Sequence, residues 1–245
     1  KIICAGSNLG YGKGNNLGFK LTKTNFALVL NPDVICGKNF FKNLSKIINE
    51  NNNFSIIGCQ YLKDKIFMPA GYFDFKKNKE FKKKFHRKNS SSLTKVDWVT
   101  GCSMLINLKK FNNKNLFDKN FFLYFEEFDL CKSLKKKGEK VYSSKKLKIH
   151  HLGFKSSFEE NSSYRKSINR LREWHWMWSS FYFYKKNFSY LYALRKISGK
   201  LLKSALKIIL YSLLLNQEEK EKYKYRFLGI LNSILNRPSS FRDNV

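Results

Sequence analysis

The segment FALVLNPDV, residues 26–34, constrains the fold of this chain more than any other, because an apolar run ends there at a polar Asn31-Pro32-Asp33 corner. Ligands of open α/β sheets bind beyond the carboxyl ends of the strands. A carboxylate placed there, such as that of Asp33, can bind a hard divalent cation that in turn holds a diphosphate. Asn-Pro-Asp is also a good turn sequence. The segment therefore indicates either a binding corner for a phosphate-bearing substrate or an ordinary turn.

Two kinds of pattern divide the chain. Up to about Phe158, short apolar runs alternate with Gly/Asn/Lys loops and helical stretches, which is typical of a mixed α/β sheet. From Tyr164 onward glycine is rare and the pattern becomes helical. We therefore expect a Rossmann-like mixed α/β sheet flanked by helices over residues 1–158, then a basic, aromatic-rich helical extension over residues 159–245. Expected strands cover residues 26–30, 55–58, 103–107 and 140–142, expected helices residues 16–22, 40–49 and 126–137, and residues 76–92 an exposed loop or lid.

The formal net charge of the chain is +30, from 48 Lys and Arg against 18 Asp and Glu. Such a charge attracts polyanions, which include nucleic acids and anionic membranes. The lysines are spread through nearly every segment, however, and Asn and Phe are also frequent, as a biased composition would produce. A basic nucleic-acid-binding protein stays an alternative, supported by the mixing of aromatic residues with Lys in the second half. Because no nucleic-acid-binding motif is recognised, we expect no nucleic-acid partner.

The cysteines and the start of the chain bear on its compartment. The five cysteines are far apart and form no CxxC or Cys/His metal spacing, which indicates a reduced, cytoplasmic protein. No apolar window reaches the roughly 18 to 20 residues of a membrane span. The sequence starts at Lys1 without a Met or a signal-peptide pattern. We expect that a segment precedes it.

A glycine- and asparagine-rich segment, SNLGYGKGNNLGF, covers residues 7–19. Gly10 and Gly12 allow tight turns and close approach of a ligand, while Asn8 and Asn16 supply amide groups before a helix. The segment is not a P-loop, because the spacing is wrong and no Gly-Lys-Ser/Thr follows. It is either a donor-phosphate site or an ordinary loop.

Three carboxylates, those of Glu126, Glu127 and Asp129, lie at the end of the aromatic run in FFLYFEEFDLCKSL, residues 121–134. Acidic residues stabilise a helix N-terminus through the macrodipole, so a structural role is possible. Carboxylates beside aromatic rings also have raised pKa values, which suits a general base near neutral pH. In a chain with so few acidic residues, the clustering favours function.

Two adjacent histidines, His150 and His151, follow a strand-like stretch in KIHHLGFKSS, residues 148–157. A neutral imidazole is a common metal ligand. A lone histidine pair is more often incidental, so this segment gains meaning only together with the others.

Taken in order, the segments NLGYGKGNNLGF, ALVLNPDV, WVTGCSMLI, FFLYFEEFDLCKSL and HHLGFKSS resemble the bacterial nucleotide-sugar glycosyltransferases of family two, which have a GT-A type fold, and especially the rhamnosyltransferase-like members. The resemblance covers about residues 2–157. It implies an inverting enzyme that moves a sugar, for example rhamnose, from a nucleotide diphosphate donor to a saccharide or lipid-linked acceptor. The product would belong to a cell-surface polysaccharide.

The resemblance also implies roles for individual residues. Asp33, in place of the family's DxD motif, would bind Mg or Mn, and Asn31 would lie near the donor. Glu127 stands at the position of the catalytic base, although a Glu replaces the usual Asp, so Glu126 stays an alternative and Asp129 a supporting residue. Donor-binding residues would also include Asn8, Gly10, Gly12 and Asn16, and the acceptor side would be lined by Trp98, Thr100 and Gly101. An additional metal ligand would be His151 rather than His150, because His151 fits the H-x-G-x-x-S pattern.

One departure from the family is that the initial strands, which hold the nucleotide base, have no counterpart in this sequence. The nucleotide pocket is then incomplete or formed by a preceding segment. A catalytically inactive glycosyltransferase-like scaffold is accordingly a second alternative.

The C-terminal part contains a basic amphipathic helix over residues 194–208, with its apolar and lysine faces separated. An aromatic cluster precedes it at residues 174–184 and suits a membrane headgroup region. We expect association with an anionic membrane at its cytoplasmic face, with a cap over the catalytic domain as the alternative. The apolar face is Leu194, Ile197, Leu201, Ala205 and Ile208, and the lysines are Lys196, Lys200, Lys203 and Lys207.

Overall fold

The structure is a computed structural model, and it describes residues 2–51, 53–63, 66–68, 70–75, 81–84, 92–152 and 162–242. Contacts divide the chain into two compact units, which are described separately below. We call residues 15–116 and 127–158 the sheet unit, and residues 1–14, 117–126 and 159–245 the helical unit. The sequence-based boundary at residue 158 stays a prediction, because the helical unit also includes two earlier segments of the chain.

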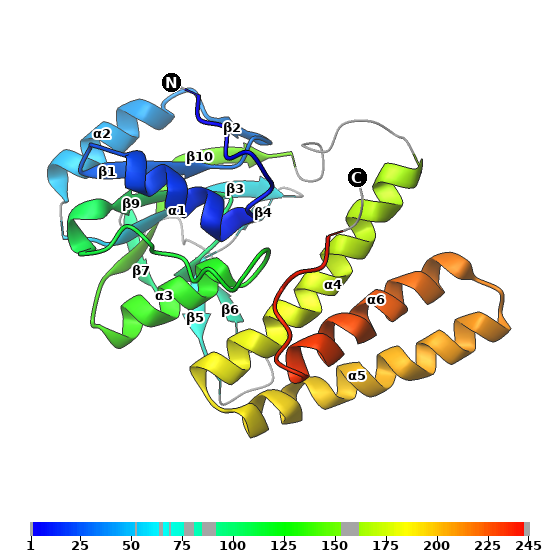
Figure 1. Ribbon diagram of the computed structural model, residues 1–245. Helices are drawn as coiled ribbons and strands as arrows, with labels where there is room; N and C mark the ends of the chain where they lie inside the picture. Colours follow the sequence, from blue (N-terminus) through cyan, green and yellow to red (C-terminus); the bar gives the residue numbers. More distant parts are fainter. Residues whose placement is uncertain are drawn as a thin grey trace. The chain divides into compact units, whose positions relative to one another are not determined.

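A mixed seven-stranded sheet forms the centre of the sheet unit (Figure 1). Its main path is β1-β9-β3-β10-β2, with β4 paired to β3 and β7 paired to β10. Strands β3 and β10 are parallel, and the other pairs are antiparallel. The strands are β1 (Phe26–Leu30), β2 (Val34–Cys36), β3 (Ile56–Lys63), β4 (Ile66–Met68), β7 (Leu93–Val96), β9 (Ser103–Asn107) and β10 (Val141–His151).

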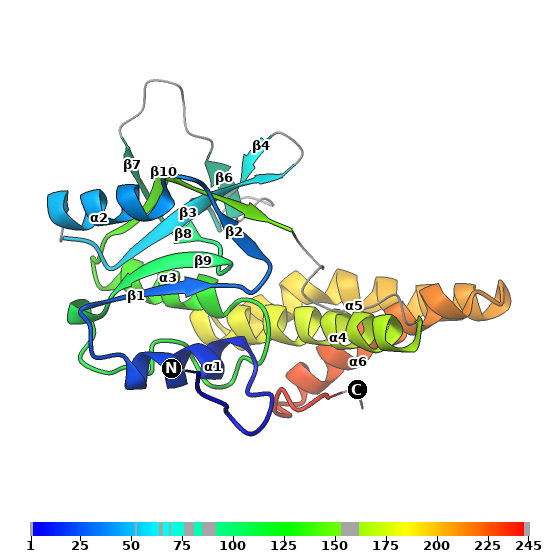
Figure 2. The same cartoon turned by 90° about the horizontal axis from the view of Figure 1, so that it is seen from above.

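Helices flank this sheet. Figures 1 and 2 show α2 (Phe40–Glu50) and α3 (Glu126–Lys136) on different sides of it. Helix α2 buries Phe40 and Ile47 against the apolar sheet residues Ile57, Leu105, Leu147 and Ile149. A short 3-10 helix, η1 (Leu108–Lys110), follows β9. The expected fold class, a mixed α/β sheet flanked by helices and followed by a helical C-terminal part, is confirmed.

A second, three-stranded sheet has the order β6-β5-β8. Its strands are β5 (Ala70–Phe73), β6 (Phe81–Lys84) and β8 (Trp98–Val99). The ring of Phe128, at the start of α3, packs against Trp98 and Phe81, at 5.2 and 4.6 Å between ring centroids. This aromatic contact joins the small sheet to the helix that carries the acidic cluster.

The helical unit is built from α4 (Ser162–Asn187), α5 (Tyr190–Leu213) and α6 (Gln217–Ile234), which all contact one another. The side chains of Ser189 and Asn216 accept hydrogen bonds from the first turns of α5 and α6, respectively. These caps satisfy backbone N–H groups that have no partner within a helix.

Several expectations need correction. Helix α1 (Tyr11–Leu21) begins five residues before the expected residue 16, so Gly12 lies within a helix and not in a loop. The strands β2, β4, β5, β6, β7 and β8 were not expected, because they are short and lack periodicity. Residues 81–84 form a strand where a loop or lid was expected, and residues 76–80 and 85–91 lie outside the described part of the chain.

In the C-terminal part, the structure covers some of the apolar residues on which the membrane expectation was based. Most of the aromatic cluster is buried in the helical unit, with Phe181 and Phe183 both 0% exposed. On α5, Ile197 of the expected membrane-facing side is likewise 0% exposed, and the other four residues of this side are half-buried. None of the described helices has a stretch both long and apolar enough to cross a membrane.

Helix α6 approaches α4 closely at Gly229. A Cβ atom built there would lie 2.3 Å from the carbonyl oxygen of Trp174, whereas one built at Gly199 on α5 would meet nothing within 4 Å. We expect Gly229→Ala to lower the free energy of unfolding by about 1–3 kcal/mol through overpacking. The control Gly199→Ala should raise it by about 0.5–1 kcal/mol, because Gly is unfavourable in helices. Urea denaturation measures both, and equal shifts would contradict the close packing.

Candidate functional site

The structure places the carboxylate of Asp33 beside the imidazole of His151. The Asp33 Oδ1 and His151 Nε2 atoms are 3.3 Å apart, and the side chains are 7% and 24% exposed. Both residues belong to the sheet unit. The strand-end carboxylate and one of the two histidines thus form a partly accessible pair.

The pairing of β2 with β10 explains why His151, and not His150, meets Asp33. In this antiparallel pair His151 lies opposite Val34, the residue that follows Asp33, and the Leu152 N–H donates to the Asp33 carbonyl at 2.9 Å. Side chains of consecutive strand residues point to opposite faces of a sheet. His150 is accordingly exposed, and of the two histidines only His151 is paired with Asp33.

The Asp33–His151 pair fits one divalent cation. Two ligands in adjacent coordination positions, each roughly 2.1 Å from an ion, are about 3 Å apart. Among the described residues no group of three or more His, Cys, Asp or Glu side chains could hold a metal ion. An ion at this pair would therefore have two protein ligands and would take its remaining oxygens from water and a phosphate-bearing substrate, as Mg²⁺ sites commonly do.

Glu127 lies in the first turn of α3, and burial raises its pKa to about 7. The backbone N–H groups of Glu127, Phe128 and Gly101 donate to its carboxylate and act in the opposite direction. The first two belong to a helix N-terminus, where N–H groups lack partners in the helix. Glu127 is therefore held in place and has a pKa suited to accepting a proton near neutral pH.

The loop after β8 connects the two parts of this site. Gly101 donates to Glu127, and the next residue, Cys102, accepts a hydrogen bond through its carbonyl from the Asn31 N–H at 3.0 Å. Burial raises the pKa of the Cys102 thiol to about 11, and the nearby carboxylates of Glu127 and Asp33 contribute to the rise. Cys102 therefore lies close to both carboxylates. Nothing in the sequence pattern indicated this position.

The expected donor-binding residues do not come together in one unit. Asn16, Asn31 and Asp33 belong to the sheet unit, and Asn16 is buried. Asn8 and Gly10 belong to the helical unit, where the Asn8 side chain accepts from the Gly10 N–H at 3.0 Å.

The two glycines have a packing role in the helical unit. Gly10 has a φ of +78°, and a Cβ there would lie 2.3 Å from the Phe122 carbonyl oxygen; at Gly12 it would lie 3.1 Å from the Phe117 Cβ. The Tyr11 N–H also donates to that Phe122 carbonyl at 2.9 Å. Close approach of two chain segments thus accounts for the glycines without a bound phosphate.

The remaining acidic candidates are more buried than a base needs to be. Glu126 is 2% exposed and its Cβ lies near Gly12, and Asp129 is 5% exposed. Glu127 is half-buried and is the most accessible of the three residues.

The acceptor-side candidates differ in accessibility. Trp98 is 2% exposed, and its Nε1–H donates to the Tyr72 carbonyl at 3.2 Å, so it belongs to the core of the small sheet. Thr100 is half-buried, with its Oγ1 atom 3.5 Å from the Cys102 Sγ, and Gly101 contacts Glu127. Gly153 to Ser156 of the histidine pattern lie outside the described residues.

Immediately before α3 the backbone is strained. Tyr124 and Phe125 both have a φ of 71°, a conformation that costs about 1–3 kcal/mol for each bulky residue. Within the helical unit their rings pack on Trp176 at 5.1 and 5.3 Å, and the Ser179 hydroxyl donates to the Leu123 carbonyl at 2.8 Å. Contacts with α4 thus hold the strained turn that leads into the acidic cluster.

Comparisons with known proteins find two similar curated proteins, and both are glycosyltransferases by name. The low-salt glycan biosynthesis hexosyltransferase Agl10 of Haloferax volcanii is 24% identical over 204 residues, which cover 69% of this chain and 63% of the relative. The rhamnosyltransferase WbbL of Escherichia coli is 26% identical over 156 residues, covering 56% of this chain and 59% of the relative. The chain thus spans about three fifths of the length of these relatives. No known protein-family profile matches it.

Two solved structures show a weaker similarity. One is GalNAc-T7 with UDP, GalNAc and Mn²⁺, with a TM-score of 0.45 and 12% identity, covering 79% of this chain and 44% of that one. The other is the mannosyltransferase PcManGT of Pyrobaculum calidifontis with GDP-Man and Mn²⁺, with a TM-score of 0.43 and 9% identity, covering 93% and 67%.

The raised pKa of Glu127 predicts a pH-dependent effect of Glu127→Gln on stability. In the unfolded chain the carboxyl ionises near its ordinary pKa of 4.5, whereas in the folded protein it ionises at about 7. The contribution of this group to the unfolding free energy of the wild-type protein is therefore fully present below about pH 4.5, and it is lost as the pH rises through 7. Relative to wild type, Glu127→Gln should gain up to about 3 kcal/mol in unfolding free energy between pH 4.5 and 8.

Urea denaturation across this pH range measures the effect. The control is Glu50→Gln on α2, which removes a carboxylate whose side chain is 54% exposed. A difference between wild type and Glu127→Gln that does not change with pH would contradict the raised pKa.

Proposed function

We propose that the chain is an inverting, metal-dependent glycosyltransferase of the GT-A type, which moves a sugar from a nucleotide diphosphate donor to a saccharide or lipid-linked acceptor. The single observation that carries the proposal is the arrangement near Cys102, whose thiol is influenced both by Asp33, which is paired with His151, and by Glu127, which has a pKa of about 7. The two glycosyltransferase relatives are consistent with this activity. Rhamnose as the sugar rests on the rhamnosyltransferase relative and on the sequence motifs.

Asp33 and His151 would hold the cation, Mg²⁺ or Mn²⁺, and Asn31 would lie beside the donor in the same turn. When bound, the ion would neutralise charge on the leaving diphosphate. We favour Mn²⁺ in catalysis, because one ligand is an imidazole nitrogen, which Mg²⁺ accepts less readily.

The side chain of Glu127 would act as the general base. Its carboxylate takes the proton of an acceptor hydroxyl, and that oxygen forms a bond to the anomeric carbon as the bond from this carbon to the diphosphate oxygen breaks. Attack opposite the leaving group inverts the configuration. The N–H groups of Gly101 and Phe128 orient the carboxylate, and the half-buried Thr100 borders the same loop.

The two alternatives make different demands on the site. An inactive scaffold gives no reason for a buried carboxylate with a near-neutral pKa beside an aspartate–histidine pair. Nucleic-acid binding is supported by the net charge of +30 and by the aromatic residues mixed with Lys in the second half, but it gives the buried carboxylates no role.

Transfer tests this function directly. The full chain is incubated with Mn²⁺, a panel of nucleotide sugars that includes dTDP-rhamnose, and saccharide acceptors, and release of the nucleoside diphosphate is measured. Glu127→Gln should lower kcat about 10²- to 10⁴-fold, as expected for loss of a base. The wild-type rate should rise with pH along a limb centred near 7, because the base works only when deprotonated.

Adjacent histidines provide a matched control for the metal pair. His151→Gln and Asp33→Asn should each lower the rate about 10²-fold or more and weaken Mn²⁺ binding, since each removes a proposed ligand. His150→Gln should change neither, because that side chain is exposed away from the pair. Equal losses for both histidine variants would contradict the proposed site, and a wild-type chain inactive with every donor would favour the scaffold.

We further propose that the helical unit binds the cytoplasmic face of an anionic membrane, where a lipid-linked acceptor would be found. The support is a stripe on α5 different from the one expected: Leu202, Leu206, Ile209 and Leu213 are 62, 58, 59 and 78% exposed. Their spacing of four, three and four residues places them on one helix face. We call these four residues the leucine stripe.

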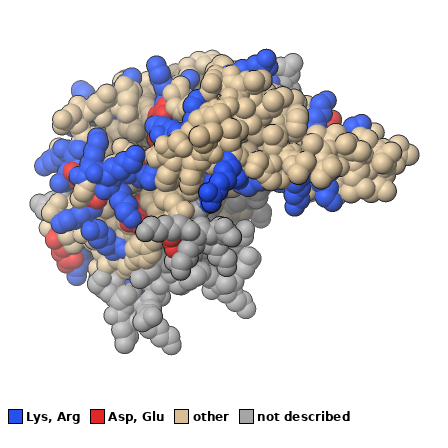
Figure 3. Space-filling model, turned by 90° about the horizontal axis from the view of Figure 1, so that it is seen from below, with Lys and Arg blue, Asp and Glu red and all other residues tan. Residues whose placement is uncertain are grey.

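The surroundings of the leucine stripe favour an anionic bilayer as its occupant. Lys203 and Lys207 lie on the same helix beside it, and Leu214 and Leu215 in the following turn are 63 and 80% exposed. Figure 3 shows largely uncharged surface at this end of the helical unit, with Lys or Arg side chains along its edge. Such a combination, an apolar face bordered by cations, is typical of helices that lie in the plane of a membrane surface.

Vesicle flotation tests the membrane proposal. Leu206→Gln combined with Leu213→Gln should lower binding to vesicles of phosphatidylcholine and phosphatidylglycerol at least tenfold, because burial of each leucine contributes about 1.5–3 kcal/mol. Leu235→Gln is the matched control, since Leu235 is 52% exposed but lies outside the stripe. Wild-type protein that stays with the soluble fraction would contradict the proposal.

A further inference from the structure

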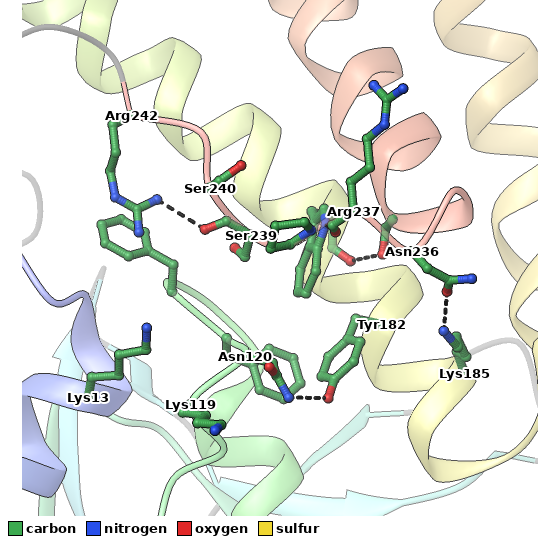
Figure 4. Close-up of a pocket in the computed structure, with 15 residues that line it drawn as sticks. Lys13, Lys119, Asn120, Tyr182, Lys185, Asn236, Arg237, Ser239, Ser240 and Arg242 are labelled. Carbon is green, nitrogen blue, oxygen red and sulfur yellow. Dashed lines mark hydrogen bonds between the residues drawn. The ribbon is translucent and has the colours of Figure 1, made fainter.

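The helical unit contains a cavity of about 480 Å³ that no sequence motif indicated (Figure 4). Its lining comes from the start of α1, from residues 119–122, from α4 and from residues 233–242, which all belong to the helical unit. Among its described lining residues there is no Asp or Glu. Its five cationic lining residues are Lys13, Lys119, Lys185, Arg237 and Arg242.

Hydrogen bonds to α4 hold the C-terminal segment that forms one wall of this cavity. The Trp178 Nε1–H donates to the Arg237 carbonyl at 3.0 Å, and His175 Nε2 lies 2.9 Å from the Phe241 carbonyl. The Ser239 hydroxyl lies 3.0 Å from His175 Nδ1. Burial lowers the pKa of His175 to about 4, so at neutral pH the imidazole is uncharged while it contacts the C-terminal segment through both ring nitrogens. The cavity is therefore built by fixed contacts.

Within the part of the chain that the structure describes, the lysines of the cavity find little compensation from neighbouring acids. Among the described residues, Lys13 and Lys119 have no carboxylate partner. The adjacent Asp118 is already occupied, since it accepts from Lys186 at 2.7 Å and from the Tyr182 hydroxyl at 3.0 Å. Lys185 donates to the uncharged amide of Asn236.

Aromatic rings complete the cavity. The Trp178 and Tyr182 rings stack at 5.0 Å between centroids, and the Arg242 guanidinium lies over the Phe122 ring at 3.2 Å. Figure 4 shows Lys13, Lys119 and Arg242 on one side of the cavity, and Lys185 with Asn236 on the other. Cations on both sides suit a ligand with two or more adjacent negative groups, and the rings suit an apolar or planar part attached to them.

We propose that this cavity binds a diphosphate-bearing ligand without a metal ion. Lys13 and Lys119 supply the uncompensated charge, and the stacked aromatic rings accept the remainder of the molecule. The source of the diphosphate rests on the proposed function, which supplies two: the nucleoside diphosphate product and a prenyl diphosphate that carries the acceptor. The cavity would thus be a second anion site, distinct in its residues from the Asp33–His151 pair.

Isothermal titration with inorganic pyrophosphate tests the proposal. The titration uses the full chain carrying Asp33→Asn, in EDTA, so that binding at the proposed metal site does not contribute. Pyrophosphate should bind, and adding Lys13→Gln and Lys119→Gln should raise Kd at least tenfold, because two charge-assisted contacts are lost. Both lysines are exposed, so folding should be unaffected.

The charge-matched control is Arg165→Gln with Lys224→Gln, which removes two exposed cations of the same unit outside the cavity. This control should leave Kd within about twofold, since distant surface charges are screened by salt. Separate titrations with UDP and with geranyl diphosphate distinguish the two sources, and the tighter ligand identifies the one that the cavity takes.

Three results would overturn the proposal: no pyrophosphate binding, equal losses in both double variants, or a single-stranded oligonucleotide that binds the cavity more tightly than any diphosphate. None of these bears on the proposed function, which is measured by sugar transfer in wild-type protein with Mn²⁺. Conversely, a chain that binds pyrophosphate but transfers no sugar would support the cavity as a diphosphate site. It would contradict the proposed function and with it the two proposed sources of the ligand.

Discussion

Antiparallel pairing between β2 and the end of β10 is the contact on which the candidate site depends. It joins residues more than a hundred positions apart in sequence, and the Leu152 N–H to Asp33 carbonyl bond fixes its register. A shift by one residue would turn His151 away and bring His150 to the same face, because strand side chains alternate. The position of the imidazole beside Asp33 is therefore a property of backbone pairing as much as of the side chains.

A second constraint concerns the buried carboxylate of Glu127. Removing a carboxyl group from water destabilises its charged form, and backbone N–H groups from α3 and Gly101 offset only part of that cost. The strained backbone at Tyr124 and Phe125 adds a further local cost immediately before this helix. Two unfavourable features next to one another are typical of a site at which geometry matters more than stability.

Much of this architecture could be predicted from the sequence. Strands 26–30 and 103–107 have the expected bounds, because continuous apolar runs end there at polar or glycine residues. Helix α1 was placed too late because Gly12 and Gly14 were taken as loop residues, although the Phe122 carbonyl meets the first N–H of the helix. That contact depends on tertiary packing, which leaves no local signal.

The candidate site was partly predictable for the same reason. Asp33, Glu127 and His151 stand in recognisable motifs, whereas the position of Cys102 close to two carboxylates depends on how loops meet in space. The cavity of the helical unit combines four separate segments, so no spacing in the sequence could indicate it. The sequence predicts the helix that becomes α5, but two faces of this helix are apolar. Which of them packs against the neighbouring helices is decided by tertiary structure.

The leucine stripe also affects how the protein behaves in solution away from any membrane. Exposed leucines on separate molecules gain free energy by covering one another, which favours self-association at high concentration. The net charge of +30 opposes this through mutual repulsion, which is long-ranged only at low ionic strength. Added salt would weaken the attraction of the protein to anionic lipid. It would also screen the repulsion that keeps protein molecules from associating. The lysines around the stripe thus keep copies of the protein apart in solution and also contribute to its attraction to anionic membranes.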